Sequence, residues 1–165
     1  MVKFKSILAA AVVAIGLAFH PGAASATPDG NTRWIWFGTD GSVSLWLLDP
    51  SLNYLGSHGY GPYGGWTPIT LDVNNSTNNA YVLWRYTDGT ANIWALDANL
   101  NFIKSNTFGP VSGWIPVGLG FDPSGNVRLY WRTTANQVTV WVINPSALTM
   151  TGSSPVYGPY FGYVF

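Results

Sequence analysis

The sequence predicts an all-β protein built from three repeats of about 47 residues, each folding as a meander of four short strands. Six tryptophans recur in pairs ten residues apart, at intervals of 48 and 47 residues: Trp36 and Trp46, Trp84 and Trp94, Trp131 and Trp141. Three Gly-Pro dipeptides keep nearly the same spacing, at residues 61–62, 109–110 and 158–159. Apolar residues alternate with others between these markers, as they do in strands.

The first 26 residues have the pattern of a secretory signal peptide. Lys3 and Lys5 precede an apolar run over residues 7–19, and the triplet Ala24-Ser25-Ala26 follows. A charged start, an apolar segment too short to span a bilayer and an A-x-A site together are typical of export signals. We therefore expect cleavage after Ala26, a single domain over 27–165, a secreted or cell-envelope location, and no membrane association after cleavage.

The middle repeat shows how each unit is built. Residues 81–86 and 91–96 read as two strands, and residues 102–108 and 114–121 as a third and a fourth. Asp-Gly between the first two predicts a two-residue type I′ hairpin turn, and the same dipeptide recurs at Asp40-Gly41.

Four strands per repeat predict blades of the β-propeller type, whose repeats have this length. The repeats cover about 33–80, 81–127 and 128–165. A β-trefoil, which also has three four-stranded units in about this length, is the alternative.

The phase of the repeats predicts an association between chains. The first repeat lacks the strand that precedes the others, and residues 162–165 begin such a strand. Three blades are also fewer than the four to eight of typical closed propellers. A homodimer in which residues 162–165 of each chain add to the first unit of the partner would supply six blades and cover the open edges.

Composition excludes several partner classes. Only 8 % of the residues are charged, against about 25 % in typical globular domains, whereas 16 % are aromatic. Once Lys3 and Lys5 are removed, five basic residues remain beside seven aspartates. Nucleic acid and anionic lipid both require clustered lysine and arginine, so we expect neither as a partner.

The residues needed for catalysis or metal binding are scarce. His58 is the one histidine after residue 26, and the chain has neither cysteine nor glutamate. Hydrolysis needs a nucleophile with a base, or paired carboxylates. The aspartates instead recur at turns, where they accept backbone hydrogen bonds. We therefore predict no catalytic residue, no metal and no cofactor.

A resemblance adds to this interpretation. The string W-R-x-x-D-G-x-x-x-x-W-x-L-D at 84–97, with G-P-Y-G-G-W at 61–66 and G-P-x-x-G-W at 109–114, resembles a family of exported bacterial tandem-repeat proteins. In unit length and aromatic density the chain is similar to sugar-binding propellers such as the tachylectin-like and fucose-lectin groups. The resemblance implies a non-catalytic exported repeat protein and leaves its ligand open.

The repeated tryptophans divide into two groups. Trp36, Trp84 and Trp131 alternate with apolar neighbours, which predicts packing in the core. Trp66 and Trp114 follow glycine-rich loops at strand starts, where an aromatic face stays exposed to stack on a sugar ring.

A carbohydrate-binding set follows from this division. It contains Trp66, Trp114 and Tyr63, together with Arg85 and Arg132 as donors to sugar hydroxyls. We therefore predict a secreted, lectin-like, non-catalytic protein that binds a glycan or polysaccharide through one shallow site per repeat. The alternative is a structural or adhesive module whose aromatic surfaces serve self-assembly.

Overall fold

The computed structural model describes residues 24–161, with side chains from Thr27 onward, and these residues form twelve strands. The first sheet contains β1 (Ala24–Ala26), β2 (Thr32–Phe37), β3 (Val43–Leu48) and β4 (Tyr54–Tyr60). The second contains β5 (Trp66–Val73), β6 (Ala80–Tyr86), β7 (Ala91–Leu96) and β8 (Phe102–Phe108). The third contains β9 (Trp114–Phe121), β10 (Val127–Thr133), β11 (Val138–Asn144) and β12 (Thr149–Ser153). This part of the chain has no helix, and thus none that could span a membrane.

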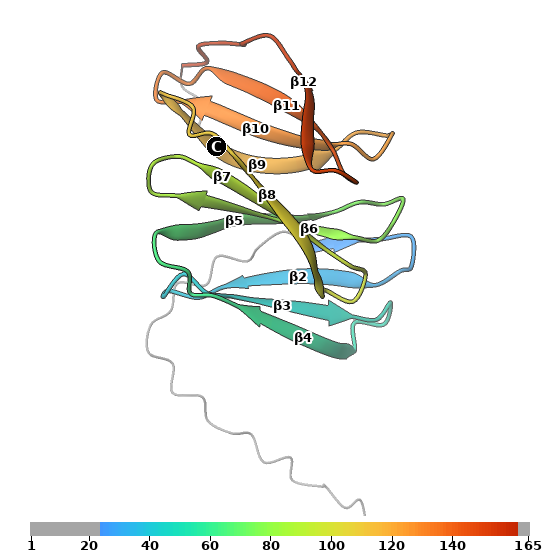
Figure 1. Ribbon diagram of the computed structural model, residues 1–165. Coiled ribbons are helices and arrows are strands. Elements are labelled where there is room, and N and C mark those ends of the chain that lie inside the picture. Colours follow the sequence, from blue (N-terminus) through green and yellow to red (C-terminus); the bar gives the residue numbers. More distant parts are fainter. Residues whose placement is uncertain (1–23, 162–165) are drawn as a thin grey trace, which may run out of the picture.

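Each sheet is an antiparallel meander whose strands pair in chain order, which confirms the all-β prediction. The three sheets lie one above another, with the second between the other two (Figure 1). Strand pairing within residues 24–161 stays inside each sheet. A β-trefoil would need pairing between units, so these residues do not have that arrangement.

The sheets are offset by one strand from the repeats predicted at 33–80, 81–127 and 128–165. The fourth strand of each sequence repeat, such as β5, pairs with the first strand of the next repeat, here β6. The first sheet fills the corresponding place with the short strand β1, the triplet predicted as the cleavage site. Most of the predicted signal peptide (1–23) and the predicted closing segment (162–165) lie outside the described residues.

The hairpin turns differ from the predicted two-residue type I′ form. Gly38 N–H donates to Ser42 O and Gly41 N–H to Gly38 O, so the loop has three residues, 39–41. Gly41 and Gly89 have φ of 86° and 89°, whereas Asp40 and Asp88 keep negative φ. This is a type I turn followed by one left-handed residue, the other common hairpin loop. The aspartate serves as a cap: Asp88 Oδ1 accepts from Thr90 N–H at 2.8 Å.

The turn between the second and third strands of the repeat confirms the predicted role of its aspartate. Asp97 Oδ1 accepts from the N–H groups of Asn99 and Asn101 at 2.8 and 2.9 Å. The turn places Leu100 in the left-handed region, at a φ of 70°, and buries it completely. Because a leucine rarely adopts this φ, the strain must be offset by the apolar surface that Leu100 buries.

Two apolar clusters fill the spaces between the sheets. The first joins Ile35, Val43 and Leu45 of the first sheet to residues of the second that include Trp84 and Leu100. The second cluster joins the other face of the second sheet to the third, and its members include Leu83, Ile93, Leu129, Trp131 and Leu148. Both faces of the second sheet are therefore core.

The predicted core positions of Trp84 and Trp131 are confirmed, since each is 1 % exposed. Trp36 is only partly buried. It stacks on Trp34, with ring centroids 5.3 Å apart, but no sheet of the described residues covers this face of the first sheet. The prediction for Trp36 was wrong because burial here depends on a neighbouring sheet, which a first sheet lacks.

A buried arginine joins the first two sheets. Arg33 is 0 % exposed, forms an ion pair with Asp29 at 2.8 Å, and donates to Thr27 Oγ1. Its guanidinium also reaches across to Ala98 O in the second sheet at 2.6 Å. The hydrogen bond from Arg33 holds the pKa of Asp29 well below its ordinary value. Asp29 therefore stays ionised when folded, and Arg33 has a charged partner and two neutral acceptors.

We expect Trp84→Ala to lower the free energy of unfolding by about 3 to 5 kcal/mol, because it removes a fully buried aromatic side chain between two sheets. Ile103→Ala is the control, since Ile103 is 49 % exposed in the same sheet and its truncation should cost under about 1 kcal/mol. Urea unfolding followed by circular dichroism measures both. Equal costs for the two variants would contradict the assignment of Trp84 to the core.

We expect Asp29→Asn to lower the free energy of unfolding by about 3 kcal/mol at neutral pH, because it leaves the buried Arg33 charge without its counterion. Asp122→Asn is the matched control. It also breaks an arginine pair, with Arg128 at 2.7 Å, but that arginine is 31 % exposed and the loss should stay below about 1 kcal/mol.

The same Asp29→Asn variant predicts a pH dependence. The pKa of Asp29 is lowered in the folded state, so its contribution is fully present above the unfolded value near 3.8 and is lost as the pH falls toward the folded value. The stability difference between wild type and Asp29→Asn should therefore shrink below about pH 4. A difference that stays constant from pH 7 to pH 3 would exclude the ion pair as its source.

Candidate ligand-binding cavities

The two glycine-rich loops have the same backbone structure. Residues 61–65 and 109–113 each begin with a cis Gly-Pro peptide and end with a glycine of positive φ. The following tryptophan closes a turn: Trp66 N–H donates to Tyr63 O at 3.0 Å, and Trp114 N–H to Val111 O at 2.9 Å. Each loop thus carries the chain from one sheet into the next and places a tryptophan at the first residue of β5 or β9.

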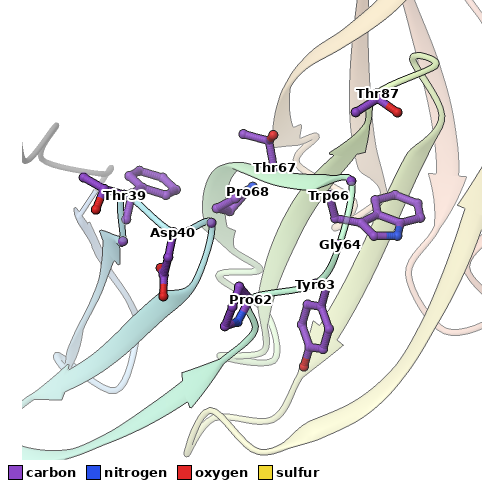
Figure 2. A pocket seen from close by; sticks show the side chains of 13 residues that line it. Thr39, Asp40, Pro62, Tyr63, Gly64, Trp66, Thr67, Pro68 and Thr87 are labelled. Carbon is purple, nitrogen blue, oxygen red and sulfur yellow. The ribbon is translucent and has the colours of Figure 1, made fainter.

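A cavity of about 540 Å³ lies between the first hairpin and the first of these loops. Figure 2 shows Thr39 and Asp40 on one side, Tyr63 and Trp66 on the other, and Pro62 and Pro68 between them. The full lining is Phe37, Gly38, Thr39, Asp40, Gly41, Pro62, Tyr63, Gly64, Gly65, Trp66, Thr67, Pro68 and Thr87. We call it the first inter-sheet cavity, because Thr87 belongs to the hairpin loop of the second sheet.

A second inter-sheet cavity, of about 510 Å³, repeats this arrangement one unit later. Its lining is Thr87, Asp88, Gly89, Pro110, Val111, Ser112, Gly113, Trp114, Ile115 and Thr134. Val111 stands where the first cavity has Tyr63, and Ile115 where it has Thr67. The second cavity therefore keeps the tryptophan, the aspartate and the two hairpin-loop threonines but has fewer aromatic and hydroxyl groups.

A third space, the aromatic cavity, adjoins the first inter-sheet cavity. It has a volume of about 280 Å³ and is lined by Tyr63, Trp66, Trp84, Asn92, Trp94 and Ser105. The ring centroids of Tyr63, Trp84 and Trp94 lie 5.3 to 5.5 Å from one another. Tyr63 and Trp66 line both spaces. They form a shared wall between a wider cavity, which also contains threonines and Asp40, and a narrower aromatic one.

Two polar atoms of the aromatic cavity's wall have unused hydrogen-bonding capacity. Trp84 Nε1 and Asn92 Oδ1 are buried and have no hydrogen-bond partner within residues 24–161. Asn92 uses its other group, Nδ2, to donate to Thr107 Oγ1 at 2.7 Å. Buried polar atoms are usually paired, so a donor and an acceptor left over beside one cavity are a reason to expect a polar ligand or water there.

The carboxylates near these cavities are engaged in turns. Asp40 Oδ1 accepts from Ser42 Oγ and from Ser42 N–H, and the side-chain hydrogen bond is the main cause of its lowered pKa. The pKa of Asp88 is lowered in the same way by Thr90. Burial raises the pKa of Asp72, but this residue lines none of the three cavities. Residues 24–161 contain no group of three or more metal-ligating side chains.

The structure brings together some of the predicted binding residues and separates others. Tyr63 and Trp66 share two cavities, and Trp114 lines the equivalent second inter-sheet cavity. Arg85 and Arg132, in β6 and β10, line none of the three. Successive residues of a strand point to opposite faces. Each arginine follows a buried tryptophan and thus lies on the other face of its sheet.

Sequence reasoning missed Asn92, Ser105 and the threonines of the hairpin loops. Asn92 is a polar residue in line with Trp94 and Leu96 on an otherwise apolar face, and this exception was a usable signal. Thr39, Thr87 and Thr134 hold the same position in all three repeats, two of them directly before Asp-Gly. Their shared place beside a cavity depends on the sheet that follows, which no local pattern reveals.

Comparison with known proteins identifies the type of fold and no family. No protein-family model matches the sequence, and no curated protein matches it. Similar solved structures include a protein of unknown function from Bacteroides caccae, with a TM-score of 0.55 and 13 % identity. The Dos1 propeller has a TM-score of 0.56 at 11 % identity, and the periplasmic gluconolactonase PpgL of Pseudomonas aeruginosa has 0.54 at 19 %.

These alignments cover 81 to 86 % of this chain, which spans only 36 to 47 % of the length of the three larger chains. At such identities the likeness shows a propeller-like all-β fold alone.

We expect Asn92→Val to change the free energy of unfolding by less than about 1 kcal/mol. The variant loses one hydrogen bond to Thr107 but also removes an unpaired buried acceptor, and a branched side chain suits a strand. Urea unfolding beside Trp84→Ala tests this. A loss of about 3 kcal/mol or more would make Asn92 a structural residue and remove it from the binding site.

Proposed function

We propose that the three sheets are blades of a β-propeller, and that the protein is an exported, non-catalytic binder of neutral glycans. The meander order within each sheet and the likeness to larger propellers support the first part. The signal-peptide pattern of residues 1–26 supports export. The second part depends on the cavities.

The observation that carries the proposal is the shared wall of Tyr63 and Trp66. Aromatic faces suit the C–H face of a sugar ring, and the aromatic cavity offers several in a space that one ring or substituent could enter. The adjoining cavity supplies groups for sugar hydroxyls, among them Thr39, Asp40 and Thr87. A mostly apolar pocket with a few polar groups is the usual form of a small-molecule site.

The repetition of the inter-sheet cavity supports a polymeric ligand. Two equivalent cavities in one chain would bind neighbouring sugar units or branches at once, so that weak single sites give useful avidity. The difference between Tyr63 and Val111 predicts unequal sites, with the first the stronger.

We further propose that the protein has no catalytic activity. Asp40 and Asp88 are the carboxylates that line the inter-sheet cavities, and both already cap the turns that carry them. Neither lies in a site with a second carboxylate, and each has a lowered pKa, which disfavours the role of general acid.

A second candidate function is a structural or adhesive module. It is favoured by the aromatic surface of the first sheet, where Trp36 stacks on Trp34 and contacts Trp46 in a tilted arrangement, without a covering sheet in the described residues. This surface lies apart from the cavities, so assembly and glycan binding are compatible.

We expect Trp66→Ala to weaken retention on the polysaccharide resins that the wild type binds by roughly tenfold, because it removes a stacking face from two adjoining cavities. Trp114→Ala should have a smaller effect, since the second cavity lacks the tyrosine. Affinity electrophoresis on a panel of neutral polysaccharides measures this, with Ile103→Ala as the control. Binding of none of the panel by the wild type, or equal retention of Trp66→Ala and wild type, would refute the glycan site.

A further inference from the structure

The two outer sheets each expose a face that the second sheet buries. In the second sheet, Val82, Trp84, Trp94, Leu96 and Leu100 pack against the first sheet. The first sheet repeats this face as Trp34, Trp36, Trp46, Leu48 and Leu52, the first-sheet end face. None of its residues is fully buried, and Leu52 is 66 % exposed where Leu100 is 0 % exposed.

The third sheet exposes the other partner of this junction, namely the face with which the first sheet packs against the second. In the first sheet, Ile35, Val43, Leu45, Leu47 and Tyr60 pack against the second sheet. The third sheet repeats them as Tyr130, Val138, Val140, Val142 and Tyr157, the third-sheet end face. Tyr130 is 39 % and Tyr157 47 % exposed, and the three valines are only partly buried. These five side chains occupy the positions at which a neighbouring sheet packs twice within the chain.

The polar contacts across the internal junction have counterparts on the end faces. At the junction of the first and second sheets, Arg33 donates to Ala98 O at 2.6 Å, and Tyr60 Oη donates to Leu100 O at 2.8 Å. The third sheet has Arg128 and Tyr157 at the positions of Arg33 and Tyr60.

The acceptors recur on the first sheet. Its turn at residues 49–53 carries Pro50 and Leu52 at the positions of Ala98 and Leu100. Leu52 has a φ of 64°, close to the 70° of Leu100, so the turn already has the junction conformation. Both the apolar surface and the hydrogen-bonding groups of a further junction are therefore present.

We propose that a second copy of the chain covers both end faces: the first-sheet end face of each chain docks on the third-sheet end face of its partner. The two faces of one chain cannot meet, because the second sheet lies between them (Figure 1). A two-fold pair forms two identical junctions and closes six sheets into a ring, within the four to eight of known propellers. In this ring Arg128 donates to the partner's Pro50 O and Tyr157 to the partner's Leu52 O.

An open strand edge supports the same pairing. β5 pairs with β6 along residues 80–86, whereas β1 pairs with β2 only at residues 32–34. Within residues 24–161, no strand pairs with this edge of β2 beyond Trp34. An open edge of this kind is a place where a strand of another chain can pair.

Analytical ultracentrifugation of the exported chain, after removal of the predicted signal peptide, at micromolar concentration tests the pairing, and we expect twice the mass of that chain. Leu52→Asp and Val140→Asp each place a carboxylate in one end face, and each should yield monomers with unchanged circular dichroism. Met150→Asp is the matched control: Met150 is 44 % exposed on the other face of the third sheet, paired with Ile143, and this variant should remain dimeric.

Each other outcome has a defined meaning. A monomeric wild type overturns the proposal, as does a mass that keeps growing with concentration, since the ring would then not close. A dimer that persists in either aspartate variant means that like faces pair, which overturns the head-to-tail arrangement. The result does not depend on glycan binding, because none of the substituted residues lines a cavity that carries the proposed function.

Discussion

Burial of apolar side chains between successive sheets is the interaction on which this structure depends. Each sheet has apolar residues on both faces, and a chain of this composition has few charged groups with which to cover them. A sheet with two apolar faces needs a neighbour on each side. The second sheet has both, and its residues Leu83, Trp84 and Ile93 are at most 1 % exposed. In each outer sheet the face toward the second sheet is the buried one: Ile35 and Trp131 are at most 1 % exposed, whereas Trp36 is only partly buried and Tyr130 is 39 % exposed.

The turn between the second and third strands of each repeat connects this burial to local chemistry. In the first two repeats an aspartate accepts backbone hydrogen bonds and a leucine takes a left-handed conformation. Leu148 has the same conformation in the third repeat, where Asn144 replaces the aspartate and the turn is one residue longer. Leu100 and Leu148 are completely buried between sheets. Leu52 has the same conformation although it is 66 % exposed, so the turn sets a left-handed leucine in every repeat, and burial offsets its strain where a neighbouring sheet is present.

The sequence allowed prediction of whatever depends on local pattern. Alternation and turn residues predicted the strands, and the alternation of Trp84 and Trp131 with apolar neighbours predicted their burial. What depends on neighbouring sheets was harder to predict. The left-handed glycine was expected in a two-residue hairpin turn, whereas the loop has three residues. Arg85 and Arg132 were predicted beside the binding tryptophans but line none of the cavities. Trp36 was predicted to be buried but is only partly buried. Asn92 could have been noticed as a polar residue on an apolar stripe, whereas the contact among Tyr63, Trp84 and Trp94 requires the packed structure.

The inter-sheet cavities and the end faces have a common origin, because both arise where one sheet meets the next. The first inter-sheet cavity takes Thr87 from the second sheet, and the second takes Thr134 from the third, so each junction completes one cavity. An open stack of three sheets has two junctions, whereas a closed pair of chains has six. The additional junctions of the pair would take Thr39 of the partner in the same role. A glycan bound at such a junction would contact both chains and would therefore stabilise the pair by mass action. Ligand binding and assembly would then be coupled, because the same junction forms the cavity and joins the chains.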